Sequence, residues 1–166
     1  DANYLIKGLS LVNGSSPIGS ATAVHMLDGV TVVVEDAFIS GMTRTGADAG
    51  GAIGGQSATL TVRRTTLFNN STLGSIGGAI SVTSSSALTV EDSLFRGNSA
   101  TGLNGDGGAI AVGSGGTVTL RRSTFSGNTS SEDGGAIAMF ASNASLTIEN
   151  CTFTGNSATG LGGALR

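Results

Sequence analysis

The sequence predicts an all-β chain that winds into a parallel β-helix of about 5.5 coils, with 27–30 residues in each coil. Three observations predict this fold class. Two short phrases recur at that spacing, apolar and polar residues alternate within each repeat, and a row of charges changes sign from one repeat to the next. A repeat of this length cannot bury a core alone, so neighbouring repeats must stack on one another.

The repeat is visible in two phrases. The first is GGA followed by Ile or Leu, and its alanines step by 27, 30, 27 and 28 residues: Ala52, Ala79, Ala109, Ala136 and Ala164. The second begins with phenylalanine, and the earliest copy has leucine instead. We expect these six side chains to form one internal row: Leu11, Phe38, Phe68, Phe95, Phe125 and Phe153. A propeller blade needs about 40 residues and leucine-rich repeats have a different consensus, so the period favours the β-helix.

Each repeat contains a segment in which apolar residues alternate with threonine and charged residues. The clearest of these segments are 87–95, 117–125 and 145–153. Such alternation is typical of a half-buried strand. A polar residue between Glu149 and Cys151 shifts the alternation by one, which predicts a corner between two strands. A further short strand is expected after each GGA phrase.

Charged residues occupy one outward position before the corner in every repeat. Their sign alternates along the chain: Lys7, Glu35, Arg63, Glu91, Arg121 and Glu149. The next position alternates wherever it is charged: Gly8, Asp36, Arg64, Asp92, Arg122 and Asn150. Opposite charges that lie over one another on adjacent strands are favourable. These carboxylates are therefore assigned to a structural ladder rather than to acid or base catalysis.

Two copies depart from the common spacing of four residues between the charge and the phenylalanine. Glu35 lies three residues before Phe38, and Arg63 lies five residues before Phe68. We interpret these as a deletion and a bulge of one residue. Asparagines follow most of the phenylalanines by three residues, which predicts a stacked amide row: Asn70, Asn98, Asn128 and Asn156.

Composition limits the function classes. The 166 residues are expected to form one β-helix segment, 1–166, that belongs to a longer repeat protein, because the chain begins within a strand phrase and stops just after GGA. A net charge of −3 provides no basic footprint for nucleic acid. No apolar run approaches the roughly 20 residues of a membrane helix. The sequence predicts no transmembrane segment, and further coils of the same or a neighbouring chain are expected to stack on it.

The paired phrases GGA[ILV] and FxxN resemble the repeats of the polymorphic membrane proteins of chlamydiae and of related bacterial and algal surface proteins. Full matches to FxxN begin at Phe95, Phe125 and Phe153, whereas the copies at Phe38 and Phe68 depart. The resemblance implies a right-handed parallel β-helix that is secreted and displayed on the cell surface as an autotransporter passenger segment used in adhesion. It implies an extracellular location and a protein or glycan partner on another cell or in an extracellular assembly.

No catalytic, cofactor-binding or metal-binding residue is assigned, and the chain is predicted not to be an enzyme. One alternative is a polysaccharide lyase or hydrolase, which would need clustered acids in a cleft. The unpaired acids lie in apparent loops: Asp28, Asp48, Asp106, Glu132 and Asp133. Asp106 and Asp133 hold the same offset to GGA, which leaves calcium bridging open. His25, the single histidine, has no companion ligand and is expected to face solvent.

Ice binding is a third alternative. An outward row of threonines supports it: Thr61, Thr89, Thr119 and Thr147. The next outward position in each repeat is charged, which interrupts a flat paired-threonine surface.

Binding is expected through a flat lateral face beside the GGA phrases. Residues of this face point outward if the isoleucines after GGA point inward: Ala23, His25, Ala52, Gly54, Ala79, Ser81, Ala109, Ala111, Ala136 and Ala138. Short side chains lose little rotamer entropy on contact. The alternative is that small residues merely suit a tight corner next to the glycine pair. In that case the loops before each GGA become the better candidates.

Overall fold

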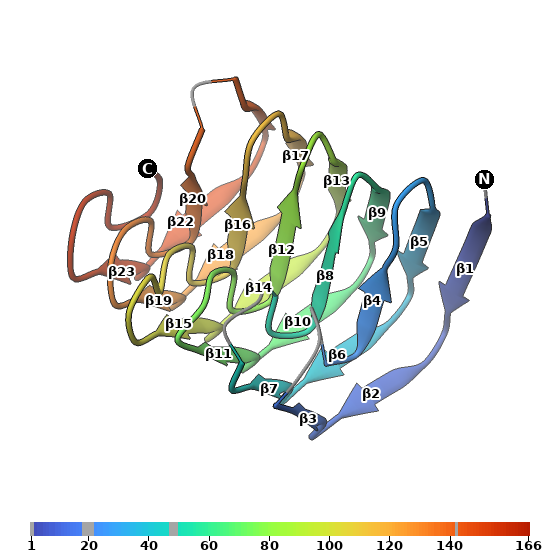
Figure 1. The fold of residues 1–166 in the computed structure, drawn as a ribbon, viewed down its shortest axis with the longest axis horizontal. Helices are drawn as coiled ribbons and strands as arrows, with labels where there is room; N and C mark the ends of the chain where they lie inside the picture. Colours follow the sequence, from blue (N-terminus) through green and yellow to red (C-terminus); the bar gives the residue numbers. More distant parts are fainter. Residues whose placement is uncertain (1, 18–21, 47–49, 142) are drawn as a thin grey trace.

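The computed structural model describes residues 2–17, 22–46, 50–141 and 143–166, which contain 23 β-strands and no helix. The coils lie side by side from the N-terminal to the C-terminal end (Figure 1). The strands form four sheets, and every strand pair is parallel. The prediction of an all-β parallel solenoid is confirmed. The described residues also contain no helix with the length and apolar character that crossing a membrane requires.

Each sheet collects strands from successive coils, six in each of the first three sheets and five in the fourth. The first sheet contains β1 (Asn3–Lys7), β5 (Thr31–Glu35), β9 (Thr59–Arg63), β13 (Ala87–Glu91), β17 (Thr117–Arg121) and β21 (Ser145–Glu149). The second contains β2 (Ser10–Val12), β6 (Phe38–Ser40), β10 (Thr66–Phe68), β14 (Leu94–Arg96), β18 (Thr124–Ser126) and β22 (Thr152–Thr154). The third contains β3 (Ser15–Ser16), β7 (Thr43–Arg44), β11 (Ser71–Leu73), β15 (Ser99–Thr101), β19 (Thr129–Ser130) and β23 (Ser157–Ala158). The fourth contains β4 (Val24–Met26), β8 (Ile53–Gln56), β12 (Ile80–Thr83), β16 (Ile110–Val112) and β20 (Ile137–Met139).

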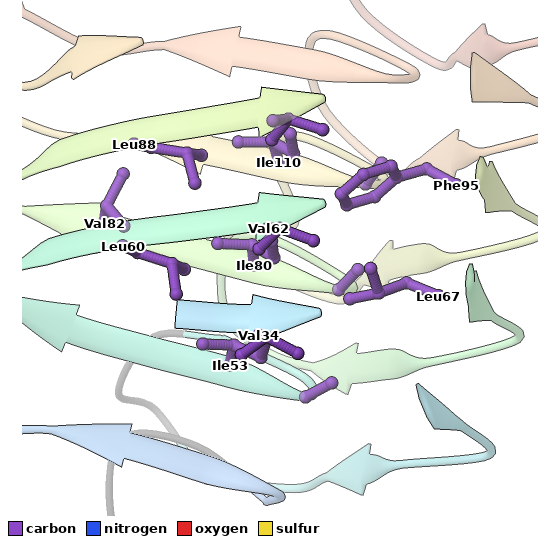
Figure 2. Packing of buried hydrophobic residues seen from close by; sticks show 14 of the residues in the cluster. Val34, Ile53, Leu60, Val62, Leu67, Ile80, Val82, Leu88, Phe95 and Ile110 are labelled. Carbon is purple, nitrogen blue, oxygen red and sulfur yellow. The ribbon is translucent and has the colours of Figure 1, made fainter. Parts of the chain in front are cut away.

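The core fills the space between the sheets with branched aliphatic side chains. Ile53, Ile80 and Ile110 enter it from the fourth sheet, opposite Val34 and Val62 of the first sheet, and all five are fully buried (Figure 2). Equivalent residues of neighbouring coils are Cα partners, as Ile80 and Ile110 are. Each coil therefore covers the apolar side chains of the coil before it, which is the burial that a single repeat cannot achieve.

The internal row of the second sheet differs from the predicted one. In register it consists of Leu11, Ile39, Leu67, Phe95, Phe125 and Phe153. Phe38 and Phe68 are not members, because they occupy outward positions and Phe38 is 39% exposed. The predicted deletion and bulge are wrong as well. Glu35 precedes Ile39 by four residues and Arg63 precedes Leu67 by four, so the spacing is constant.

The last three side chains of this row are stacked aromatic rings. The ring centroids of Phe95 and Phe125 are 4.8 Å apart, and those of Phe125 and Phe153 are 4.9 Å apart, with nearly parallel planes. Stacked rings contribute beyond the area that they bury.

The predicted asparagine row is confirmed as a buried amide ladder. Asn70 Nδ2 donates to Asn98 Oδ1 at 3.0 Å, Asn98 Nδ2 donates to Asn128 Oδ1 at 3.0 Å, and Asn128 Nδ2 donates to Asn156 Oδ1 at 2.9 Å. Each Oδ1 also accepts the backbone N–H of the asparagine on the preceding coil. The second hydrogen of each side-chain amide is donated to a backbone carbonyl oxygen. Asn98 Nδ2, for example, donates to Leu67 O at 3.0 Å. Satisfied in this way, the polar amides tolerate full burial.

The corner between the first and second sheets is built from residues with positive φ, in the left-handed region of the Ramachandran plot. Five non-glycine residues occupy it with φ between 47° and 53°: Asp36, Arg64, Asp92, Arg122 and Asn150. A hydroxyl row next to the corner offsets this strain. Ser93 Oγ donates to Glu91 O at 2.7 Å and accepts the Thr65 N–H at 3.2 Å, and Ser123 accepts the Ser93 N–H in the same way. The predicted corner is present, and the hydroxyl row that stabilises it was not foreseen.

Candidate functional site

The structure buries most of the face that was predicted to bind. Seven of its side chains are completely inaccessible: Ala52, Ala79, Ser81, Ala109, Ala111, Ala136 and Ala138. Ala23 is half-buried. His25 is exposed and lines a hollow of the first coil with Tyr4 and Leu27. The prediction of a solvent-facing surface of small residues is therefore wrong at these seven positions.

The chain's own loops cover this face. Before β8, β12, β16 and β20, a glycine with positive φ folds back over the outer side of the strand: Gly50, Gly77, Gly107 and Gly134. A Cβ placed on Gly77 would collide with the carbonyl oxygen of Ile80 and come within 3.1 Å of Ser81 Cβ. Small residues are needed so that the loop can pack against the strand. The alternative reading of these residues, as a requirement of a tight corner, agrees with this geometry.

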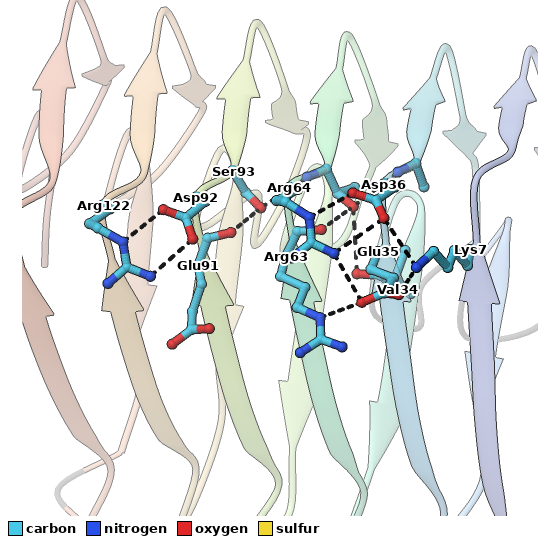
Figure 3. Close-up of polar contacts among 12 residues, drawn as sticks. Lys7, Val34, Glu35, Asp36, Arg63, Arg64, Glu91, Asp92, Ser93 and Arg122 are labelled. Carbon is cyan, nitrogen blue, oxygen red and sulfur yellow. Dashed lines mark hydrogen bonds and ion pairs between the residues drawn. The ribbon is translucent and has the colours of Figure 1, made fainter.

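The predicted charge ladder lies in register along the corner edge of the first sheet. The Cα partners run in the order Lys7, Glu35, Arg63, Glu91, Arg121 and Glu149. Lys7 Nζ lies 2.8 Å from Glu35 Oε1, and Arg121 Nε lies 2.8 Å from Glu149 Oε2. Glu91 Oε1 lies 3.7 Å from Arg121 Nη1. These ion pairs connect β1 to β5 and β17 to both β13 and β21, and Arg63 pairs with Glu35 between β9 and β5 (Figure 3).

The second charged position adds bidentate pairs. Arg64 holds both carboxylate oxygens of Asp36, and Arg122 holds both of Asp92, each with Nε at 2.7 Å. Glu35 is the most enclosed member, because its side chain is only 5% exposed and contacts Lys7, Arg63 and Arg64 (Figure 3). Exposed pairs contribute about 0–1 kcal/mol each. Glu35 differs because an unpaired carboxylate would be costly in that position.

The ladder lowers the pKa values of its carboxyl groups. Hydrogen bonds from Lys7 and Arg63 outweigh the effect of burial and hold the pKa of Glu35 below its ordinary value of 4.5. Arg64 lowers the pKa of Asp36, and Arg121 lowers that of Glu149. A carboxyl group whose pKa is lower in the folded state stabilises the fold above its unfolded pKa. This contribution is lost as the pH falls through the folded value.

Stability is therefore expected to decrease as the pH falls below about 4.5, the ordinary glutamate value. Urea unfolding midpoints measured from neutral to strongly acidic pH test this. Glu35→Gln should be less stable than the parent at neutral pH and should lose less stability on acidification. Glu132→Gln is the matched control, because Glu132 is exposed and forms no ion pair within the described residues. Identical pH profiles for the parent and Glu35→Gln would contradict the prediction.

The loop acids connect adjacent coils through hydrogen bonds. Asp106 Oδ1 accepts the Asp133 N–H at 2.8 Å, Asp133 Oδ1 accepts the Leu161 N–H, and Asp133 Oδ2 lies 2.7 Å from Arg166. Calcium bridging by Asp106 and Asp133 stays an untested alternative. Asp48 lies outside the described residues. Over the described ranges, no three His, Cys, Asp or Glu side chains are grouped so that they could hold a metal ion.

The outer face of the first sheet carries more threonine than the sequence analysis predicts. The predicted row is in register: Thr61, Thr89, Thr119 and Thr147. Two residues earlier on each strand lies a second row that was missed: Thr31, Thr59, Ala87, Thr117 and Ser145. Counting back by the strand period of two would have found it. The charged ladder borders this face, and ice binding stays an untested alternative.

The outer face of the second sheet presents apolar side chains and an arginine to which the sequence assigns no role. Phe68, Leu94 and Arg96 border a shallow groove of about 570 Å³ across β10, β14 and β18. A second groove, of about 560 Å³, continues on the other side of Leu94 and reaches Arg64 and Arg122. Leu94 lies between the two, so they form one surface, which we call the second-sheet groove.

The groove is positively charged. Three arginines and one aspartate line it: Arg64, Arg96, Arg122 and Asp92. Arg64 and Arg122 are held by aspartates of the ladder. Arg96 is exposed and forms no ion pair in the part of the chain that the structure describes. Its guanidinium is thus available to an anion.

Comparison with known proteins agrees with this architecture. Residues 2–162 match the family described as a right handed beta helix region, which is nearly the whole chain. The comparisons with curated proteins and with solved structures gave no match. With its four parallel sheets and in-register coils, the chain belongs to the right-handed β-helix family.

Proposed function

We propose that this chain is a non-catalytic binding module that acts in adhesion or structural assembly, with the second-sheet groove as its contact surface. The observation that carries the proposal is the outer face of β10, β14 and β18, where half-buried Phe68 and Leu94 lie beside exposed Arg96. The fourth sheet is covered by the chain's own loops, and the charges bordering the first sheet neutralise one another. The second sheet thus combines partly exposed apolar side chains with an arginine that forms no ion pair within the described residues, a mixture found at binding surfaces.

The state of the acids supports a non-catalytic role. A general acid needs a carboxyl group whose pKa is raised toward the working pH. Neighbouring cations instead lower the pKa values of Glu35, Asp36, Asp92 and Glu149. These groups stay ionised and engaged in ion pairs. A polysaccharide lyase or hydrolase, the family's other activity class, would have to use different residues.

The setting of this role follows from the recurring phrases. GGA[ILV] and FxxN resemble the repeats of autotransporter passenger segments such as the polymorphic membrane proteins. This resemblance supports an extracellular, cell-surface location, with further coils of the same or a neighbouring chain beside this segment. The partner would be a protein or glycan on another cell or in an extracellular assembly.

Adhesion measurements with matched variants test the proposal. Beads coated with the purified chain are applied to surfaces bearing whole cells, extracellular proteins or polysaccharides, and attachment is counted. Leu94→Glu places a charge in the groove and should abolish attachment. Thr89→Glu is the control, because it places the same charge on the outer face of β13 in the same coil. Equal attachment by both variants would show that the groove is not the contact surface.

The same preparation distinguishes binding from catalysis. Soluble polysaccharides are incubated with the chain and assayed for new reducing ends and for unsaturated products. A binding module leaves them intact. Cleavage that disappears in Leu94→Glu would overturn the non-catalytic role and assign the groove to an enzyme.

A further inference from the structure

We propose that copies of this chain bind one another head to tail, with the last coil of one copy stacked on the first coil of the next. The two end coils lie at opposite ends of the molecule (Figure 1). They are separate from the second-sheet groove, so the inference goes beyond the proposed function. Three properties of the end coils carry it: the register of their strands, the sign of their charges, and the apolar side chains that they leave uncovered.

The end coils have matching strands. The outer strands of the first sheet, β1 and β21, have five residues each, those of the second, β2 and β22, have three, and those of the third, β3 and β23, have two. The spacing from sheet to sheet is also the same, because equivalent positions follow one another by four residues in both coils: Lys7, Leu11 and Ser15 in the first, and Glu149, Phe153 and Ser157 in the last.

Backbone groups on these outer strands are available for pairing. Within the described residues, β1 pairs only with β5, and β21 pairs only with β17. Each strand therefore has one edge whose N–H and C=O groups lie outside the sheet ladder, and such an edge is a template for another strand. Placing β1 of one copy beside β21 of another continues the same parallel sheet.

The charge ladder ends with opposite signs. Lys7 lies on the first of its six strands and Glu149 on the last. Head-to-tail stacking sets Glu149 of one copy against Lys7 of the next, so Lys7 lies between two acids, as Arg121 lies between Glu91 and Glu149. Head-to-head stacking would oppose two lysines, and tail-to-tail stacking two glutamates. Like charges at a contact are unfavourable, so the ladder selects the head-to-tail orientation, which repeats from copy to copy.

Apolar side chains at both ends lack the cover that internal coils have. Tyr4 and Ile6 occupy inward positions of β1, yet Tyr4 is 57% exposed, and with Val24 they line a hollow of about 380 Å³. At the other end, Ile148 is 37% and Leu165 is 39% exposed. Equivalent side chains of the middle coils are fully buried, because a neighbouring coil lies on each side. A stacked copy supplies the missing neighbour at each end.

The same contacts already occur inside the chain. Stacking would place Leu11 of one copy against Phe153 of another, and Leu67 is the Cα partner of Phe95 in the same internal row. The ring of Phe153 stacks on Phe125 on one side only within the described residues. The junction therefore needs no packing arrangement that the molecule does not already use.

Sedimentation measurements over a range of concentrations test the association. The mass of the parent should rise with concentration in whole multiples of one chain. Lys7→Glu and Glu149→Lys should each raise the dissociation constant about tenfold or more, because each places like charges at the junction. An equimolar mixture of these two variants should associate as the parent does, since every mixed junction again joins opposite charges. Circular dichroism checks that each variant is folded.

Leu94→Glu is the control, because it changes the second-sheet groove and leaves both end coils intact. It should associate as the parent does, so failure of this proposal and failure of the proposed function are distinguishable. A parent chain that stays monomeric at every concentration would overturn the proposal and assign the two end faces to further coils of the same polypeptide. Association that the charge reversals do not weaken would overturn the head-to-tail arrangement.

A disulfide tests the register without changing a charge. Leu9 and Cys151 hold the same position, two residues after Lys7 and Glu149. Strands that pair in parallel are about 4.8 Å apart, within the Cα separation that a disulfide spans. With oxidised glutathione, Leu9→Cys should form covalent multimers linked between positions 9 and 151, which peptide mass spectrometry identifies.

Ala37→Cys is the matched control for the disulfide. Ala37 holds the same position one coil further in and is buried, so no link between positions 37 and 151 should form. The parent, with its single cysteine, can form only covalent dimers. Multimers of Leu9→Cys that are linked only between identical positions would overturn the head-to-tail register.

Discussion

Replacement of Phe95 with alanine is expected to lower the free energy of unfolding by about 3–5 kcal/mol. The side chain is fully buried, and its ring stacks on Phe125 with the centroids 4.8 Å apart. The coils on either side are held by their own strand pairing, so they cannot close the cavity. Urea unfolding monitored by circular dichroism measures the loss.

Phe38→Ala provides the control for this prediction. Phe38 shares the same sheet and residue type but points outward and is 39% exposed. Its replacement should cost about 1 kcal/mol or less, in proportion to the smaller area that it buries. Equal losses for the two variants would place both rings in the same environment and would contradict the observed register.

Asn98→Ala is expected to lower the free energy of unfolding by about 2–6 kcal/mol. The replacement leaves two buried hydrogen-bond donors without their acceptor, at a cost of about 1–3 kcal/mol each. These donors are the backbone N–H and the Nδ2 of Asn70, both of which use Asn98 Oδ1. Equilibrium unfolding in urea measures the effect, and Asn3→Ala is the control, because Asn3 is exposed on β1. If the two alanine variants are equally stable, the amide ladder does not hold the coils together in solution.

Asn98→Asp separates the amide's donors from its acceptor. Aspartate keeps oxygen atoms for the Asn70 donors but places a second oxygen against Leu67 O and Asn128 Oδ1. Such repulsion between acceptors should make this variant at least as unstable as the alanine variant at neutral pH. A milder effect would show that the Nδ2 hydrogen bonds contribute little.

The fold and the ladder could be predicted from the sequence because both are periodic. Alternation with period two assigns inward and outward positions locally, and parallel stacking then aligns the charges. The prediction for Phe38 and Phe68 is wrong because it matches the repeats by the position of phenylalanine and not by the alternation of inward and outward residues. The inward positions in those coils hold Ile39 and Leu67, which fill the same space as aliphatic side chains.

Burial by the chain's own loops could not be predicted in this way. Alternation correctly turned Ser81 and Ala111 away from the core, but no local pattern shows where the loop before the strand will lie. The close approach of Gly77 to Ile80 depends on the path of the loop. Burial on the outer side of a strand is a tertiary property, and small residues at an outward position fit an exposed face and a covered one equally well.

The second-sheet groove was missed for a different reason. Its distinctive residues, Phe68, Leu94 and Arg96, occur in single coils and so do not belong to the repeat. A search for repeated positions discards such residues by design. Because Phe95 was predicted to point inward, alternation would have placed its strand neighbours Leu94 and Arg96 outward on one face. In a solenoid, the shared positions describe the scaffold, whereas the departures from the repeat mark where a specific function can be placed.

The alternating ladder also has a consequence for how such a chain can change length during evolution. Backbone geometry repeats with every coil, but the charge pattern repeats only with every second coil. Loss of one internal coil, for example the coil that carries Glu35, would set Lys7 directly against Arg63. Gain of a single duplicated coil would place two like charges in contact in the same way. Genes for such solenoids should therefore lengthen or shorten by pairs of coils, and an odd number of added coils should be accompanied by a charge reversal at the junction.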